Sequence, residues 1–191
     1  PTGRRIGYLA RICPTKGLHL LTDAFIELKK QESFDDLALW VAGDLSTADR
    51  PYFLEQKKKL DAAECGENFF YAGRLSRREK IDFLGQLDLF SVPAPYHEPK
   101  GRYVLEALAR GIPVVQPAHG AFPELLARIG GGQLFPPGDS RALTTALADL
   151  LRDPGKRAQL AAEGSEGVRA GACAEHSARA TIDTYRQVIE S

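Results

Sequence analysis

The 191-residue sequence contains no methionine, a single tryptophan and only three cysteines. Cys13, Cys65 and Cys173 are odd in number and far apart, which disfavours a disulfide framework and a zinc site. A reducing compartment such as the cytoplasm is therefore expected. Because the chain lacks methionine and opens with Pro1, we expect it to be a piece of a longer protein.

The sequence also lacks long apolar runs and an excess of charge of either sign. No apolar run approaches the roughly 18 residues of a membrane-spanning helix, and no charged leader precedes an apolar core, so neither a transmembrane segment nor a signal peptide is predicted. Basic and acidic residues both number 25, which argues against a nucleic-acid partner. Any anion site must therefore be local. The length and a hydrophobic content of 43% indicate one globular domain over residues 1–191.

Short apolar segments alternate with segments of helical periodicity. Strands are expected at Arg5–Ala10, Leu37–Gly43, Asn68–Gly73, Asp88–Val92, Ile112–Val115 and Gly130–Phe135. Helices are expected at Leu18–Gln31, Pro51–Ala63, Ser76–Gln86, a segment after Gly101, a segment near Glu124, and Ser140–Arg152. This alternation predicts an α/β fold, a doubly wound parallel sheet of about six strands that binds its ligand at the carboxyl ends of the strands.

The segment from His97 to Val115 has the pattern of a ligand site at the start of a helix. Pro99 and Gly101 indicate a loop, and the apolar residues that follow have helical spacing until Gly111. The first amides of such a helix, from Gly101 to Val104, lack partners within the helix and point toward the loop. A helix start of this kind attracts anions such as phosphate.

Glu98, seven intervening residues and Glu106, followed by the run from Ala107 to Val115, resemble a known signature. It is the Glu-x7-Glu motif of retaining glycosyltransferases of the GT-B fold, the family called glycosyl transferases group 1. The resemblance implies that Glu98 contacts the donor sugar and Glu106 holds the ribose. It also implies that the amides of Gly101, Arg102, Tyr103 and Val104 receive the diphosphate of a nucleoside diphosphate sugar, for example a UDP-sugar.

The loop after the first expected strand carries two cations, Arg11 and Lys16. They match the arginine and lysine of the family's G-R-L-x-x-x-K-G loop, although Ala10 replaces the usual glycine. Fixed cations stabilise the charge that develops on a departing diphosphate, so the resemblance makes both residues catalytic. The family places the nucleobase just after the third strand, which makes Arg74 and Leu75 candidates for the donor site.

From Asp153 to the end the chain is predicted to be helical, with breaks near Pro154 and between Gly164 and Gly171. In the GT-B fold the last helix crosses back to the other domain. The resemblance therefore implies that residues 154–191 pack on a missing N-terminal acceptor domain of the same chain. Through that domain the protein could also lie at a membrane surface.

Other chemistries lack their signatures. His97-Glu98 is not followed by the second histidine of a zinc protease, and there is no Asp-x-Asp metal motif, Walker loop or G-x-G-x-x-G fingerprint. No metal and no separate cofactor are expected. Two alternatives stay open: a noncatalytic module that binds a nucleotide sugar on the same fold, and another GT-B enzyme such as an epimerase or phosphorylase. For the second, neither a pyridoxal-binding lysine nor an epimerase-type histidine set is visible.

Overall fold

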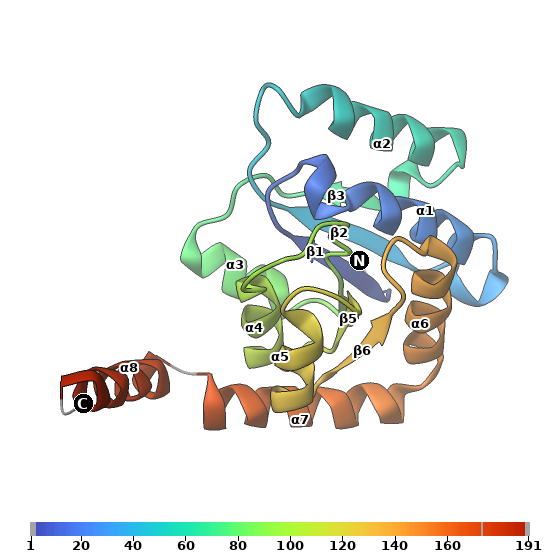
Figure 1. The fold of residues 1–191 in the computed structure, drawn as a ribbon. Coiled ribbons are helices and arrows are strands. Elements are labelled where there is room, and N and C mark those ends of the chain that lie inside the picture. Colours follow the sequence, from blue (N-terminus) through green and yellow to red (C-terminus); the bar gives the residue numbers. More distant parts are fainter. Residues whose placement is uncertain (1–2, 173, 190–191) are drawn as a thin grey trace.

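A six-stranded parallel sheet lies at the centre of the chain (Figure 1). It is seen in a computed structural model that describes residues 3–172 and 174–189, so Cys173 lies outside the described residues. The strand order is β3-β2-β1-β4-β5-β6. The strands are β1 Arg5–Leu9, β2 Ala38–Ala42, β3 Phe69–Tyr71, β4 Leu89–Phe90, β5 Val114–Pro117 and β6 Gly132–Phe135. The expected doubly wound α/β fold is confirmed.

Helices cover both faces of the sheet. They are α1 Leu18–Lys29, α2 Arg50–Ala62, α3 Arg77–Leu84, α4 Arg102–Ala109, α5 Phe122–Ile129, α6 Ser140–Arg152, α7 Pro154–Gly171 and α8 Ala174–Ile189. Helix α1 contacts α2 and α6, which places these three on one face. On the other face α4 and α5 both contact α7, and α3 lies beside α4 (Figure 1). The chain therefore winds in both directions from β1.

The core forms because the strands and the inner helix faces are apolar. Ile6 and Tyr8 of β1 and Leu39 and Val41 of β2 are fully buried. The buried face of α1 consists of Leu18, Leu21, Thr22, Ala24, Phe25 and Leu28. Burying one such aliphatic or aromatic side chain stabilises a fold by about 1.5 to 3 kcal/mol. This packing holds the loops at the carboxyl edge of the sheet on a rigid frame.

The strand order places the expected ligand loops next to each other. Strands β1 and β4 are neighbours at the centre of the sheet, and Ile6 pairs with Leu89. The chain leaves β1 toward β2 and leaves β4 toward β5. Where the winding direction reverses in this way, the two departing loops leave a crevice beyond the strand ends. Lys16 and Glu98 lie on these two loops.

The predicted helix break between Gly164 and Gly171 is wrong. Helix α7 runs without interruption from Pro154 to Gly171. Its glycines allow close packing, because a Cβ on Gly164 would lie 2.6 Å from Cδ2 of Leu108. The ends of some strands also differ from expectation, since β5 begins at Val114 and continues to Pro117.

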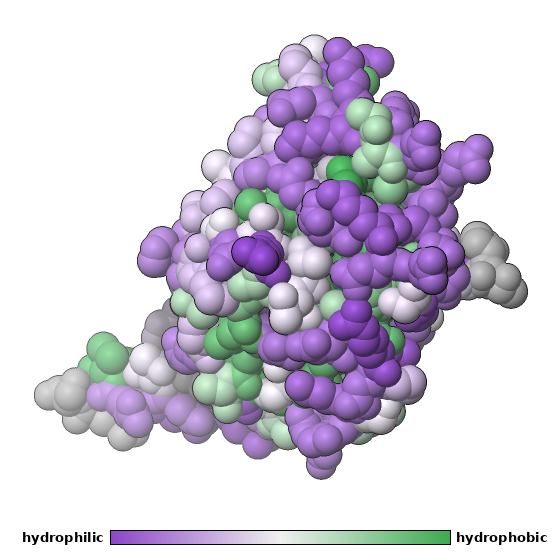
Figure 2. Space-filling model, turned by 90° about the vertical axis from the view of Figure 1, so that its right-hand side faces the viewer, coloured by the Kyte–Doolittle hydropathy of each residue, from purple (hydrophilic) through white to green (hydrophobic). Residues whose placement is uncertain are grey.

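Helix α8 projects away from the sheet (Figure 1). Its side chains Ile182, Tyr185, Val188 and Ile189 are exposed, and green atoms mark the end of this segment in Figure 2. The side of the molecule that bears α6 is mostly hydrophilic in the same view. Helix α7 packs on α4, α5 and α6 of this same domain, and the packing of residues 154–191 on another domain stays a prediction. Within the described part of the chain, no helix has both the length and the hydropathy needed to cross a membrane.

Candidate functional site

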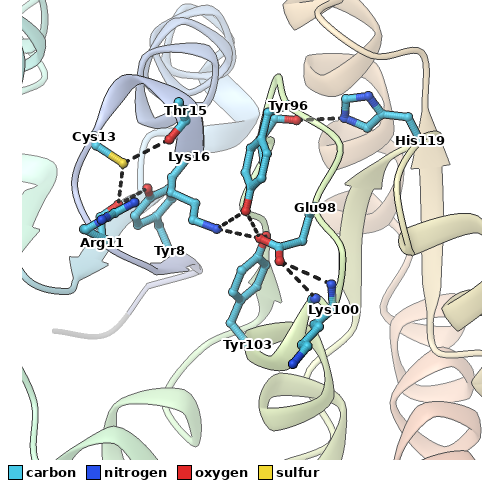
Figure 3. Close-up of polar contacts among 12 residues, drawn as sticks. Tyr8, Arg11, Cys13, Thr15, Lys16, Tyr96, Glu98, Lys100, Tyr103 and His119 are labelled. Atoms are coloured by element: carbon cyan, nitrogen blue, oxygen red, sulfur yellow. Dashed lines mark hydrogen bonds and ion pairs between the residues drawn. The ribbon is translucent and has the colours of Figure 1, made fainter.

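The carboxylate of Glu98 is the centre of a polar cluster at the carboxyl edge of the sheet (Figure 3). Its Oε2 atom lies 2.5 Å from Nζ of Lys16, 2.5 Å from the hydroxyl of Tyr96 and 3.2 Å from the hydroxyl of Tyr103. Its Oε1 atom accepts from the amides of Lys100 and Gly101 at 3.3 and 3.4 Å. Five donors from two loops and one helix therefore converge on this one carboxylate.

Lys16 comes to this cluster from the loop between β1 and α1. A short 3-10 turn, Pro14–Lys16, orients it. Its ammonium also donates to the hydroxyl of Tyr96 at 2.6 Å and lies 4.7 and 5.4 Å from the ring centroids of Tyr96 and Tyr103. The two tyrosine rings thus shield a nearly buried cation from water, which strengthens its attraction for any anion nearby.

The electrostatics of the cluster keep Glu98 ionised. Burial alone would raise the pKa of the Glu98 carboxyl, but the hydrogen bonds from Lys16 and Tyr96 outweigh it and lower the pKa to about 2. For the Lys16 ammonium, burial acts in the opposite direction and would lower the pKa. Its hydrogen bonds to Glu98 and Tyr96 outweigh burial, so the pKa of Lys16 is raised. At neutral pH the site therefore contains a full ion pair with only 6% of Glu98 exposed.

The start of α4 offers fewer free amides than the sequence predicts. Gly101, with φ of 59°, directly precedes the helix, and its amide donates to the carboxylate of Glu98. The amide of Val104 donates to the carbonyl oxygen of Gly101 at 2.9 Å. The amides of Arg102 and Tyr103 donate to no protein atom within residues 3–172 and 174–189. An anion above the helix can thus bind the unengaged amides of Arg102 and Tyr103. It can share the amides of Gly101 and Val104 with their present acceptors. The side chain of Val104 is fully buried in the core.

The loop between β5 and α5 fixes the backbone of Glu98. The amide of Ala121 donates to the carbonyl oxygen of Glu98 at 2.8 Å. A Cβ on Gly120 would lie 2.7 Å from both the amide nitrogen and the carbonyl oxygen of Glu98. Nε2 of His119 donates to the carbonyl oxygen of Ala94 at 2.8 Å (Figure 3). The loop after β5 therefore contacts the backbone of Glu98 directly, and there is no room for a side chain at Gly120.

The other candidates from the sequence lie outside this cluster. Arg11 is exposed, and in Figure 3 it lies beyond Lys16 on the side away from Glu98. Its carbonyl oxygen accepts from the hydroxyl of Tyr8 at 3.1 Å, while its guanidinium takes part in no ion pair within the described residues. Arg74 is exposed and Leu75 half-buried in the loop between β3 and α3. Because β3 is an edge strand, this loop lies at the margin of the carboxyl edge.

Glu106 belongs to a second polar contact. Its Oε1 atom lies 2.6 Å from Nζ of Lys80 on α3, and the two side chains are 33% and 30% exposed. Glu106 and Glu98 are thus on one helix and its preceding loop, as expected, but each has its own cationic partner. The ion pair with Lys80 engages Oε1 of Glu106 and not its Oε2 atom.

Sequence reasoning missed Tyr96 and Lys80. A hydroxyl two residues before a glutamate has no diagnostic spacing, and Lys80 meets Glu106 only after α3 and α4 pack side by side. The phenol of Tyr103 was also missed, since only its amide was considered. The described residues contain no group of three or more metal-ligating side chains.

Known proteins provide an independent comparison. A model of the family described as "Glycosyl transferases group 1" matches residues 1–167. The phosphatidyl-myo-inositol mannosyltransferase of Mycobacterium leprae is 32% identical over 168 residues, which cover 87% of this chain and 42% of that enzyme. The chain spans about half the length of the curated relatives it matches.

Solved structures show the same architecture. The C-terminal domain of a glycosyl transferase group 1 family protein (LpcC) from Francisella tularensis has a TM-score of 0.77 at 26% identity. The alignment covers 87% of this chain and 85% of that one. Anabaena Alr3699/HepE in complex with UDP has a TM-score of 0.78 at 23% identity, covering 87% and 44%. The second similarity concerns the fold alone.

Proposed function

Since the chain belongs to the glycosyl transferases group 1 family, we propose that it is the donor-binding domain of a retaining glycosyltransferase. In this proposal residues 1–191 form one domain of a longer two-domain enzyme. The donor is a nucleoside diphosphate sugar, and the acceptor binds to an N-terminal domain of the same chain. The family match is the support for this ligand class, and the fold itself is one that binds UDP in Anabaena HepE.

One observation carries the proposal: Lys16 and the start of α4 face the same point. The Nζ atom of Lys16 reaches Oε2 of Glu98, and the amides of Lys100 and Gly101, directly before the helix, reach Oε1 of the same carboxylate. A cation and a helix N-terminus that converge in this way form a site for a phosphate group. Glu98 then lies within one side-chain length of the bound diphosphate, where the donor sugar would be attached.

The remaining candidates extend along the donor. Glu106 binds the ribose hydroxyls through its carboxylate, and the loop with Arg74 and Leu75 faces the nucleobase. Arg11 and Lys16 stabilise the negative charge on the diphosphate as the glycosidic bond breaks. Glu98 orients the sugar. The leaving diphosphate accepts the proton of the acceptor hydroxyl on the face from which it departs, so this domain needs neither a dedicated base nor a metal.

The proposal makes this domain half of an active site. A GT-B enzyme reacts in the cleft between two domains, so residues 1–191 alone are expected to bind donor weakly and to transfer no sugar. Titrating the chain with UDP, GDP, UDP-glucose and GDP-mannose by calorimetry tests the binding. Saturable binding of one nucleotide series that is lost in Lys16→Met supports the proposal. Absence of binding to all four, or rapid sugar transfer by the chain alone, contradicts it.

A further inference from the structure

The hydroxyl of Tyr96 lies between the two opposite charges of the site (Figure 3). It accepts a hydrogen bond from Nζ of Lys16 at 2.6 Å and donates one to Oε2 of Glu98 at 2.5 Å. Both distances are shorter than the 3.2 Å between the hydroxyl of Tyr103 and Oε2 of Glu98. Among the described residues, Tyr96 is thus the one neutral side chain that forms a hydrogen bond with each member of the ion pair.

The phenol of Tyr96 is suited to hold a carboxylate permanently. Burial and the hydrogen bond to Glu98 raise the pKa of the Tyr96 phenol, so it keeps its proton. Unlike the ammonium of Lys16, the neutral O–H group has no charge that attracts a diphosphate, so it can continue to donate to Glu98. The ring lies beside the ammonium of Lys16, with 4.7 Å between Nζ and the ring centroid, and this contact does not require the hydroxyl.

A diphosphate competes with Glu98 for Lys16. The ammonium is the only basic side chain with an ion pair to Glu98 among the described residues, and phosphate oxygens are strong acceptors for it. When Lys16 turns to the diphosphate, the buried carboxylate loses its cationic partner, which is costly unless other donors hold it. Its remaining contacts are one short hydrogen bond from Tyr96, a longer one from Tyr103 and two amides beyond 3.2 Å.

We propose that Tyr96 is a positioning residue that holds the carboxylate of Glu98 toward the donor sugar while Lys16 binds the diphosphate. This inference rests on the proposed function. Tyr96 acts through Glu98 and touches no reacting atom itself. Its removal therefore weakens recognition of the sugar more than recognition of the nucleoside diphosphate.

The test compares the affinity for the nucleotide sugar with that for the nucleotide alone. Calorimetry on the wild-type chain with UDP, UDP-glucose, GDP and GDP-mannose identifies the pair that binds. The quantity of interest is the Kd of the nucleoside diphosphate divided by the Kd of its sugar derivative. In Tyr96→Phe this ratio is expected to fall about tenfold, the usual effect of losing a hydrogen bond to a charged group.

Two further variants separate positioning from a merely structural role. Tyr103→Phe removes the longer contact to Glu98 without touching Lys16, so its ratio should fall by about threefold or less. In a Glu98→Gln background, Tyr96→Phe should change the ratio little, because two residues that act through one contact are not additive. Circular dichroism and the thermal midpoint check that each variant is folded.

The outcomes are distinct. An unchanged ratio in Tyr96→Phe, or an equal loss for both ligands, overturns the inference and leaves the proposed function intact. An equal fall of the ratio with and without Glu98 also overturns it. Failure of the wild-type chain to bind any of the four ligands instead removes the proposed function, and the inference with it.

Discussion

Gly167 of α7 lies directly against the backbone of Ile129 at the end of α5. A Cβ on Gly167 would be 2.1 Å from the carbonyl oxygen of Ile129 and 2.8 Å from its carbonyl carbon. No side chain rotation relieves such a contact, because both partners are backbone atoms. The glycine therefore sets how closely α7 approaches the face that carries α4 and α5.

Gly167→Ala should destabilise the fold by about 1 to 3 kcal/mol, because α7 must shift outward and loosen its packing. Gly171→Ala is the matched control, since it lies in the same helix and a Cβ there meets nothing within 4 Å. The control should be neutral or slightly stabilising, as alanine favours helix more than glycine. Urea unfolding of both variants measures the difference, and equal stability of the two would contradict the packing described here.

Glu98→Gln should tighten binding of the nucleoside diphosphate without sugar by about threefold to tenfold. The substitution removes a like charge beside the diphosphate and frees Lys16. Binding of the nucleotide sugar should gain less or weaken, since the sugar contact is impaired. Calorimetry measures both ligands, with Glu32→Gln as an exposed control remote from the cluster. Weaker binding of the nucleoside diphosphate by Glu98→Gln would argue against competition for Lys16.

The stability of the chain should depend on the protonation of Glu98 in acid. Its pKa in the folded protein is about 2, below its ordinary value of 4.5, so its ionised form stabilises the fold above about pH 4.5. That contribution, at most about 3 kcal/mol, should decline as the pH falls from about 4.5 toward 2. Urea unfolding of wild type and Glu98→Gln across this interval should show converging stabilities. A constant difference would mean that Glu98 is not held in its charged form.

Glu106→Ala should weaken binding of the nucleoside diphosphate by about 1 to 3 kcal/mol, the usual loss for a charged hydrogen bond. Its effect on stability should be below about 1 kcal/mol, because the pair with Lys80 is partly exposed. Glu67→Ala, at the opposite edge of the sheet, serves as the control for calorimetry and thermal unfolding. Unchanged affinity in Glu106→Ala would remove this residue from the site.

The positions of Lys16 and Glu98 near each other could be predicted from the sequence. Alternating apolar and helical patterns indicate parallel strands, and residues that follow such strands share one edge. The convergence of Tyr96 and Tyr103 on Glu98 could not be predicted, because the loop that carries Tyr96 has no periodicity and the turn from this loop into α4 sets the direction of Tyr103. The helix through Gly164 and Gly167 was also missed, since low helix propensity was outweighed there by tertiary packing.

Lys16 and Glu98 are 82 positions apart, and the loop after β5 fixes Glu98 from a third part of the chain. Closing a loop of that length carries an entropy cost, so we expect these contacts to form late in folding. Ligand affinity in this chain therefore reports on completed folding, and a ligand that binds only the finished arrangement stabilises it by mass action. Nucleotide in the buffer should accordingly protect the chain from proteases that cleave its partly unfolded forms.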